Sequence, residues 1–259
     1  MTQQDRLLYL IHFLIEESSE YRGLTIPESE REQKKLLRSL MNVRPPKPVA
    51  KEFLEIQDRY LAEERDKKEI VTLSGLSPAE KGIYLWQGDI TTLQVDAIVN
   101  AANSALLGCF IPCHGCIDNA IHSAAGVQLR LACCLLMEKQ KKEEPTGMAK
   151  ITEAYNLPCQ YVLHTVGPVI DGRPTEEDCR LLASCYRSCL ELADSNRLKS
   201  VAFCCISTGE FHFPNDDAAR IAVETVRRYR SEHNSEIEVI FNVFKDSDYE
   251  IYRRLLRTD

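Results

Sequence analysis

Residues Val95 to Asn103 read VDAIVNAAN, a short apolar run rich in β-branched residues that ends in two asparagines. Val95 to Val99 are predicted to form a buried strand, because the run is bounded by turn residues and carries only one charge. Asn100 and Asn103 then follow the strand at the carboxyl edge of its sheet. Ligands of parallel sheets bind at that edge. The stretch therefore predicts both an α/β fold and the place of a site.

Strand-like and helix-like segments alternate on either side of this run, between about residue 70 and residue 259. The predicted strands are Ile83–Trp86, Tyr161–Val166, 201–206 and 237–243, and the predicted helices are 117–140 (one or two helices), 176–194, 214–231 and 247–257. Nearly continuous apolar strands that alternate with amphipathic helices are typical of a largely parallel sheet with helices on both faces.

Residues 1–69 differ from the rest because their apolar residues recur at helical spacing and no strand pattern is present. Three helices are expected, the second beginning near Pro27, and the proline-rich segment Arg44–Pro48 connects the second to the third. The charged run Glu63 to Glu69 is expected to be a solvated helix end. The predicted division is a helical N-terminal extension, 1–69, and an α/β domain, 70–259.

Composition limits the partners and the compartment of this 259-residue chain. The net charge is −7 and no basic block occurs, which argues against DNA as a partner, because neutralising phosphates needs clustered Lys and Arg. The apolar run Leu7 to Ile15 is too short for a membrane span and lacks the flanks of a signal peptide. Eleven cysteines in a chain of this length are expected to be reduced thiols. A cytoplasmic protein without a membrane partner is expected.

The densest chemical signal is the loop Gly108 to Cys116, GCFIPCHGC, which places three thiols and an imidazole within eight positions. These are ligands that zinc prefers, and residues two apart in an extended segment share a side. The preferred metal ligands are Cys109, His114 and Cys116, which leave a position for water or substrate. Recruitment of Cys113 would instead close a structural site. A buried thiol cluster and a redox C-x-x-C dithiol are the remaining alternatives.

Two further motifs follow predicted strands. Ser207-Thr208-Gly209-Glu210-Phe211 precedes a helix and could cradle an anion with its backbone N–H groups, although such a loop is more often an ordinary turn. Asp89, after Gly88, can accept hydrogen bonds from an exocyclic amine, or it can merely satisfy a turn. Asp118 could likewise be only the N-cap of the helix that follows.

Together these motifs resemble the macrodomain family, whose modules bind ADP-ribose. The resemblance covers about residues 70–259 and is carried, in order, by Gly88-Asp89-Ile90, by Val95 to Asn103, by Asp118 with Ala120-Ile121-His122 and Ala124-Ala125-Gly126, and by Ser207-Thr208-Gly209 ahead of Phe213-Pro214. It implies a three-layer α/β/α macrodomain with a mixed, largely parallel sheet. The chain departs from the family pattern before Asp118, where only Gly108 remains of a glycine-rich stretch and the Cys/His loop takes its place.

That replacement resembles the zinc-dependent branch of macrodomains, microbial protein-ADP-ribose hydrolases with a helical N-terminal extension. The resemblance implies Zn²⁺ as cofactor, mono-ADP-ribosylated protein as substrate, and, as functional partners, a lipoate-carrier protein related to glycine cleavage H protein and a sirtuin-type ADP-ribosyltransferase. By matching position, it implies that the following residues bind ADP-ribose: Asp89 and Ile90 at the adenine, Asn100 and Asn103 at the distal ribose, and Ser207, Thr208, Gly209, Glu210 and Phe211 around the diphosphate.

The hypothesis that follows from this resemblance is hydrolysis of the bond between the distal ribose and an acidic side chain. Asn103 would orient the ribose, and Asp118 would position water or accept a proton. Three competing functions remain at this point: a noncatalytic ADP-ribose reader with structural zinc, a metal-stabilised scaffold without a nucleotide ligand, and a thiol oxidoreductase using Cys113 and Cys116.

Overall fold

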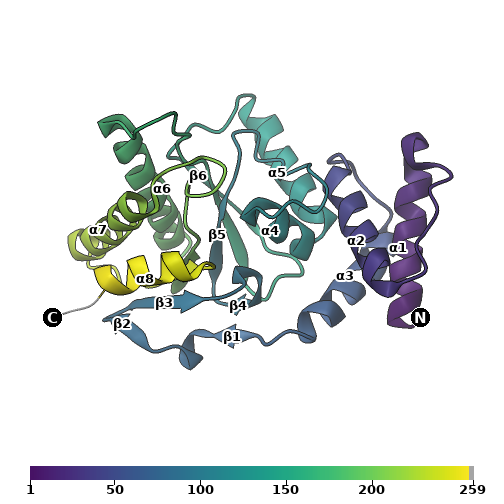
Figure 1. The fold of residues 1–259 in the computed structure, drawn as a ribbon, viewed down its shortest axis with the longest axis horizontal. Helices are drawn as coiled ribbons and strands as arrows, with labels where there is room; N and C mark the ends of the chain where they lie inside the picture. Colours follow the sequence, from purple (N-terminus) through teal and green to yellow (C-terminus); the bar gives the residue numbers. More distant parts are fainter. Residues whose placement is uncertain (257–259) are drawn as a thin grey trace.

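The core of the computed structural model, which describes residues 1–256, is a seven-stranded sheet in the order β2-β3-β9-β8-β5-β7-β6 (Figure 1). Its strands are β2 (Pro78–Glu80), β3 (Ile83–Gln87), β5 (Ala97–Ala101), β6 (Ala149–Glu153), β7 (Tyr161–Thr165), β8 (Ser200–Phe203) and β9 (Glu238–Val243). The edge strands β2 and β6 run antiparallel to their neighbours, and all other pairs are parallel. The predicted mixed, largely parallel sheet is confirmed.

Helices cover both faces of this sheet, as predicted. Figure 1 shows α6 (Glu176–Ser195), α7 (Asn215–His233) and α8 (Asp246–Leu255) on one side, and α4 (Ile117–Ala125) and α5 (Val127–Gln140) on the other. The segment 117–140 is two helices because Gly126, at φ +99°, breaks it and turns the axis by 110°. Within residues 1–256, no single helix is long and apolar enough to cross a membrane, and only the bent α4–α5 pair reaches that length and composition.

The strands of the sheet lie close to their predicted positions, and the differences have local causes. The strand expected at Val95–Val99 lies at Ala97–Ala101, because the Asp96 carboxylate accepts a hydrogen bond from the backbone N–H of Ser200 (3.2 Å) before the ladder begins. Strand β6 was not predicted, since Lys150, Thr152 and Glu153 give it the polarity of a loop. Two short strands outside the main sheet, β1 (Val71–Thr72) and β4 (Leu93–Gln94), pair in parallel.

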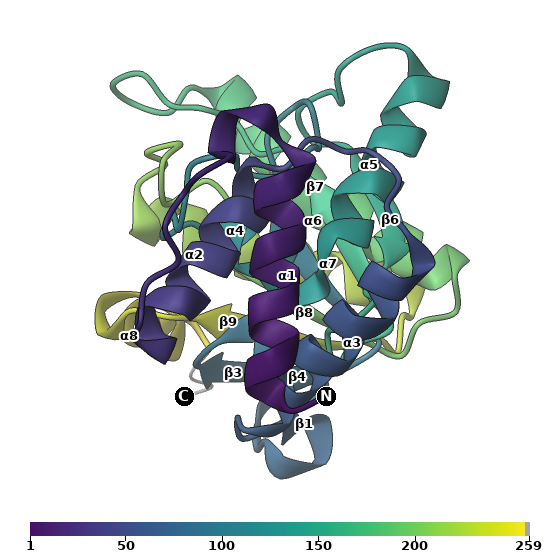
Figure 2. The same ribbon diagram turned by 90° about the vertical axis from the view of Figure 1, so that its right-hand side faces the viewer.

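The N-terminal extension consists of three α-helices, α1 (Gln3–Glu17), α2 (Glu30–Val43) and α3 (Lys51–Asp66), with α1 foremost in Figure 2. The expected start of the second helix near Pro27 is wrong. The hydroxyl of Ser29 accepts a hydrogen bond from the backbone N–H of Glu32 (3.3 Å) and caps the helix, which begins at Glu30. Arg44–Pro48 connects α2 to α3, as predicted.

The extension has its own hydrophobic core, distinct from the core around the sheet. Leu7, Leu10 and Ile11 of α1 pack with residues of α2 and α3, among them the fully buried Phe53. Val127, the first residue of α5, belongs to the same cluster and joins the extension to the α/β domain. In Figure 1 the extension lies outside α4 and α5, on the side of the sheet that carries the Cys/His loop.

Candidate functional site

The predicted site residues follow strands β3, β8 and β5 at the carboxyl edge of the sheet. Asp89 follows β3, the Ser207–Phe211 loop follows β8, and Asn103 and the Cys/His loop follow β5. In the order β3-β9-β8-β5, the first and last of these strands are three spacings apart, about 14 Å. The edge thus offers a carboxylate at one end, a candidate anion loop in the middle and a Cys/His loop at the other end, a layout suited to a long ligand.

Cys109, His114 and Cys116 are brought together by the loop between β5 and α4. Their ligand atoms all lie within 4.8 Å of one another, and Cys109 Sγ is 3.7 Å from His114 Nδ1. Burial raises the pKa of the Cys116 thiol to about 12, and the nearby Cys109 adds to the shift. Two thiols and an imidazole at this spacing fit zinc, since a cation would offset the cost of ionising the thiols.

Cys113 points away from this cluster. The residue has φ +52°, and its thiol lies 3.2 Å from Ser39 Oγ and 3.4 Å from the carbonyl oxygen of Lys35, both on α2. Its backbone N–H also donates to Asn42 Oδ1 (2.9 Å). The loop therefore presents two thiols and an imidazole as possible metal ligands, the number that leaves a coordination position for water or substrate.

Asp118 lies in the first turn of α4 and is only 5% exposed. It is not the N-cap of that helix, because Cys116 Sγ takes this place and accepts from the backbone N–H of Asn119 (3.4 Å). Asp118 Oδ1 accepts a hydrogen bond from Asn100 Nδ2 (2.8 Å) and lies 3.4 Å from His122 Nε2. Burial raises the pKa of Asp118 to about 6, against the opposing hydrogen bond from Asn100.

Asn100 is fully buried next to Asp118. Its side chain contacts Asp118 and His164, and the contact with the distal ribose that the resemblance implies stays a prediction. His164, Cys133 and His122 form a second, fully buried group of metal-type ligand atoms. Both nitrogens of His164 have partners, Asn100 Nδ2 at 3.2 Å and Thr152 Oγ1 at 2.9 Å, and burial lowers its pKa to about 4. His164 is therefore a neutral core histidine.

Asn103 stabilises the start of the Cys/His loop. Its Oδ1 accepts from the backbone N–H of Ala105 (3.1 Å), and its Nδ2 donates to the carbonyl oxygen of Gly108 (3.2 Å). Gly108 has φ +77°, and a Cβ there would come within 2.9 Å of the His122 ring, so glycine is required. Asn103 is half-buried, beside the predicted metal ligands.

The loop from Ser207 to Phe211 has several features of an anion cradle. Ser207 adopts φ +64°, and its buried Oγ has no hydrogen-bond partner within residues 1–256. In the same part of the chain, the backbone N–H groups of Gly209, Glu210 and Phe211 donate to no other group. Thr208 Oγ1 donates to the carbonyl oxygen of Cys205 (3.0 Å) and holds the turn. Successive free N–H groups in a turn bind phosphate oxygens.

Replacing Gly167 with alanine is expected to disturb this loop and to weaken binding of ADP-ribose, the ligand that the sequence resemblance implies. A Cβ at Gly167 would lie 2.0 Å from Ser207 Oγ and 2.8 Å from Ile206 Cγ2. The overlap forces the Ser207 turn to move, at a cost of about 1–3 kcal/mol, which is roughly a 5- to 150-fold loss of affinity if it all falls on binding. Calorimetry with ADP-ribose measures the loss. Gly115→Ala, whose Cβ meets open space, is the control; equal affinities for the two variants would contradict this description.

Asp89 caps the short 3-10 helix Ile90–Thr92. Its Oδ1 accepts from the backbone N–H (3.0 Å) and Oγ1 (2.6 Å) of Thr91, and its Oδ2 is paired with Lys68 Nζ (3.0 Å). Burial raises the pKa of Asp89, but these hydrogen bonds outweigh burial and lower the pKa below its ordinary value. Ile90 is buried beside it. An adenine amine would have to share Oδ2 with Lys68.

Glu210 connects the anion loop to the Cys/His loop. Its carboxylate lies 3.6 Å from His114 Nε2, on the opposite side of the ring from the nitrogen that faces Cys109. A carboxylate on the outer nitrogen fixes the tautomer of a ligating histidine. Sequence reasoning did not single out Arg38, Asn119 or Arg130, which contact the Cys/His loop from α2, α4 and α5.

Comparisons with known proteins agree with this arrangement. The model of the Macro domain family matches residues 99–222. A protein-ADP-ribose hydrolase of Treponema medium is 56% identical over 99% of this chain and 100% of its own length, and one of Staphylococcus aureus is 49% identical over 98% and 96%. A Trypanosoma brucei macrodomain solved in complex with ADP-ribose is similar in structure, with a TM-score of 0.67, 32% identity, and coverage of 89% of this chain and 97% of that one. The chain therefore belongs to the macrodomain family.

Proposed function

We propose that this protein is a zinc-dependent hydrolase that removes mono-ADP-ribose from acidic side chains of modified proteins. The observation that carries the proposal is the order of the three loops along the sheet edge, with the anion loop between Asp89 and the Cys/His cluster. The relatives named protein-ADP-ribose hydrolase match nearly the full chain, including the extension. This coverage supports an enzyme over a reader or a scaffold.

The binding roles follow from position. Asp89 Oδ2 accepts from the adenine amine after displacing Lys68, whose side chain is half-exposed. The diphosphate is held by the N–H groups of Gly209, Glu210 and Phe211 and by the Ser207 hydroxyl, which needs an acceptor. The ligand then runs toward β5, where Asn103 and the Cys/His cluster lie, and its distal ribose is placed beside them.

Hydrolysis at the distal ribose needs a nucleophile and a group that stabilises the charge that develops in the transition state. Cys109, His114 and Cys116 would hold the zinc ion, which would supply Lewis acidity at this end of the ligand. Asp118, two residues from Cys116, positions water or accepts its proton, while Asn100 fixes the orientation of the carboxylate. Hydrolysis adds one water across the ribosyl–carboxylate bond and yields ADP-ribose and a free acidic side chain.

The experiment that tests the function compares three substrates: a protein mono-ADP-ribosylated on glutamate or aspartate, one modified on serine and one modified on arginine. Free ADP-ribose is quantified over time, and cleavage of the ester-linked substrate by neutral hydroxylamine is the chemical control. Release from the acidic linkage alone is expected. Retention of ADP-ribose without release from any substrate would identify a reader instead. The lipoate-carrier protein and the sirtuin-type transferase stay predictions of the sequence resemblance, and a cytoplasmic location stays a prediction from the sequence composition.

A further inference from the structure

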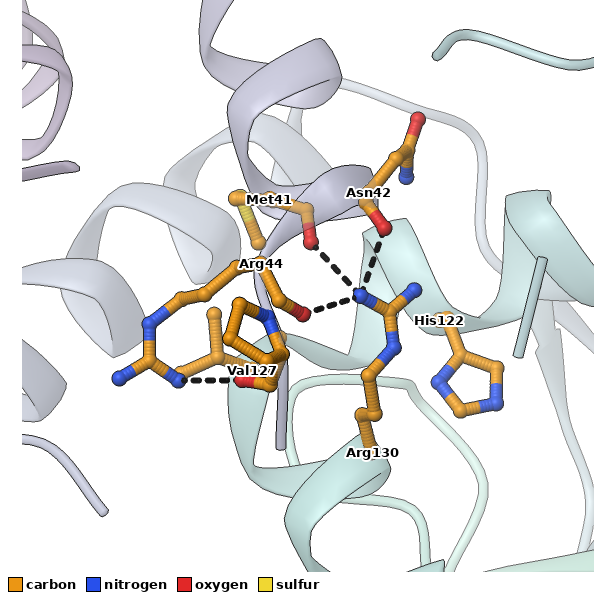
Figure 3. A pocket seen from close by; sticks show the side chains of 8 residues that line it. Met41, Asn42, Arg44, His122, Val127 and Arg130 are labelled. Carbon is orange, nitrogen blue, oxygen red and sulfur yellow. Dashed lines mark hydrogen bonds between the residues drawn. The ribbon is translucent and has the colours of Figure 1, made fainter. Parts of the chain in front are cut away.

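Arg130 of α5 binds the carboxyl end of α2. Its Nη1 donates to the carbonyl oxygens of Met41 (3.2 Å), Asn42 (2.6 Å) and Arg44 (2.6 Å), the three bonds that Figure 3 shows converging on one nitrogen. Unpaired carbonyls at the end of a helix carry partial negative charge, so a guanidinium there is favourable. Arg130 is only 5% exposed and therefore needs such partners.

The other side of the same guanidinium contacts the Cys/His loop. Arg130 Nε donates to the carbonyl oxygen of Leu107 (2.7 Å), and Nη2 donates to that of Cys109 (3.3 Å). The guanidinium carbon also lies 4.1 Å from the centre of the Phe110 ring, a cation–π contact. The planar guanidinium of Arg130 thus joins the end of α2 to Leu107 and Cys109, the two neighbours of Gly108.

A second arginine holds the far half of the loop. Arg38 of α2 donates from Nη2 to the carbonyl oxygen of His114 (3.1 Å) and from Nε and Nη2 to Asn119 Oδ1 (3.1 and 2.7 Å). Asn119 in turn donates from Nδ2 to the carbonyl oxygen of Ile111 (2.9 Å). The backbone at both Cys109 and His114 is therefore fixed through α2, as is that of Cys113 through Asn42.

We propose that Arg130 and Arg38 are positioning residues for the metal site, and that the N-terminal extension serves as the template on which the Cys/His loop takes its ligand-binding shape. The inference rests on the zinc part of the proposed function. Ordering a loop costs conformational entropy. A loop whose backbone carbonyl oxygens are already hydrogen-bonded loses less conformational entropy when a cation binds. Neither arginine touches the ligand atoms, so both act through the backbone.

The test measures zinc affinity by competition with a chromophoric chelator, which needs no turnover. The variants are Arg38→Gln, at a half-buried site, and Arg130→Lys, which keeps the positive charge but loses the planar guanidinium group. Arg65→Gln is the matched control, since Arg65 also joins the extension to a backbone carbonyl, that of Asn156 (3.2 Å), but away from the loop. Arg38→Gln and Arg130→Lys are expected to bind zinc about 10- to 100-fold more weakly, the range for residues that orient metal ligands. Arg65→Gln is expected to bind like the wild type.

The melting temperature of each metal-free variant and its affinity for ADP-ribose separate positioning from folding. Weaker zinc binding with unchanged ADP-ribose affinity supports the inference. Wild-type zinc affinity in both folded variants, or an equal loss in Arg65→Gln, would overturn it while leaving the proposed function intact. A wild-type protein that binds no zinc would overturn both, and this is measured first.

Discussion

Replacing Cys109 with alanine is expected to abolish ADP-ribose release while ADP-ribose binding survives. Cys109 supplies one of three donors within 4.8 Å, and its thiol is far along the sheet edge from Asp89. In the proposed mechanism the zinc ion would stabilise charge that develops at the distal ribose, so its loss is expected to lower kcat by about 10²–10³-fold or more. Zinc content, turnover on the acidic linkage and calorimetry with ADP-ribose are the three measurements. Cys116→Ala should act in the same direction, but Cys116 also caps α4.

Cys113→Ser is the matched control for this prediction. Cys113 lies in the same loop, but its thiol contacts Ser39 and Lys35 rather than the cluster. The variant is expected to keep zinc and turnover near wild-type levels. If Cys113→Ser lost the metal and Cys109→Ala retained it, the assignment of the ligands would be wrong.

Asp118→Asn is expected to lower kcat by about 10²–10⁴-fold, the range for loss of a general base, with ADP-ribose affinity and zinc content little changed. The substitution is isosteric, and its amide oxygen can still accept from Asn100 Nδ2. Only the ability to take a proton or to orient water by charge is removed. Single-turnover kinetics on the acidic linkage give the chemical step separately from product release.

Asp96→Asn provides a carboxylate control away from the site. Asp96 precedes β5 at the opposite end from Asn100, where it accepts from the backbone N–H of Ser200. Its loss should reduce stability and leave kcat unchanged. A kcat for Asp118→Asn within a fewfold of the wild type would contradict the role given to Asp118.

The fold could be predicted from the sequence where buried strands require continuous runs of apolar residues. The runs at Ile83, Tyr161 and 237–243 are apolar enough to be recognised as strands, and the structure places strands at each. The edge strand β6 was not recognisable, because an edge strand tolerates polar residues. The start of α2 was misplaced because Pro27 suits a first helical turn, and only the Ser29 cap shows where the helix begins.

The residues of the candidate metal site could be predicted from the sequence, but the burial of their neighbours could not. The sequence placed Cys109, His114 and Cys116 in one loop, and the structure brings their ligand atoms together. It could not show that Asn100 is buried beneath Asp118, because the two residues are 18 positions apart and meet only when β5 and α4 pack. Arg130 and Arg38 were missed for the same reason, since their partners lie more than 20 positions away.

Zinc dependence is tested by measuring ADP-ribose release by the wild-type protein before zinc removal, after it, and after zinc is restored. The chelated, folded protein is expected to bind ADP-ribose, to release none from the acidic linkage, and to recover full turnover with about one zinc per chain. Full turnover by a preparation shown to be free of metal would mean that the hydrolysis does not depend on zinc.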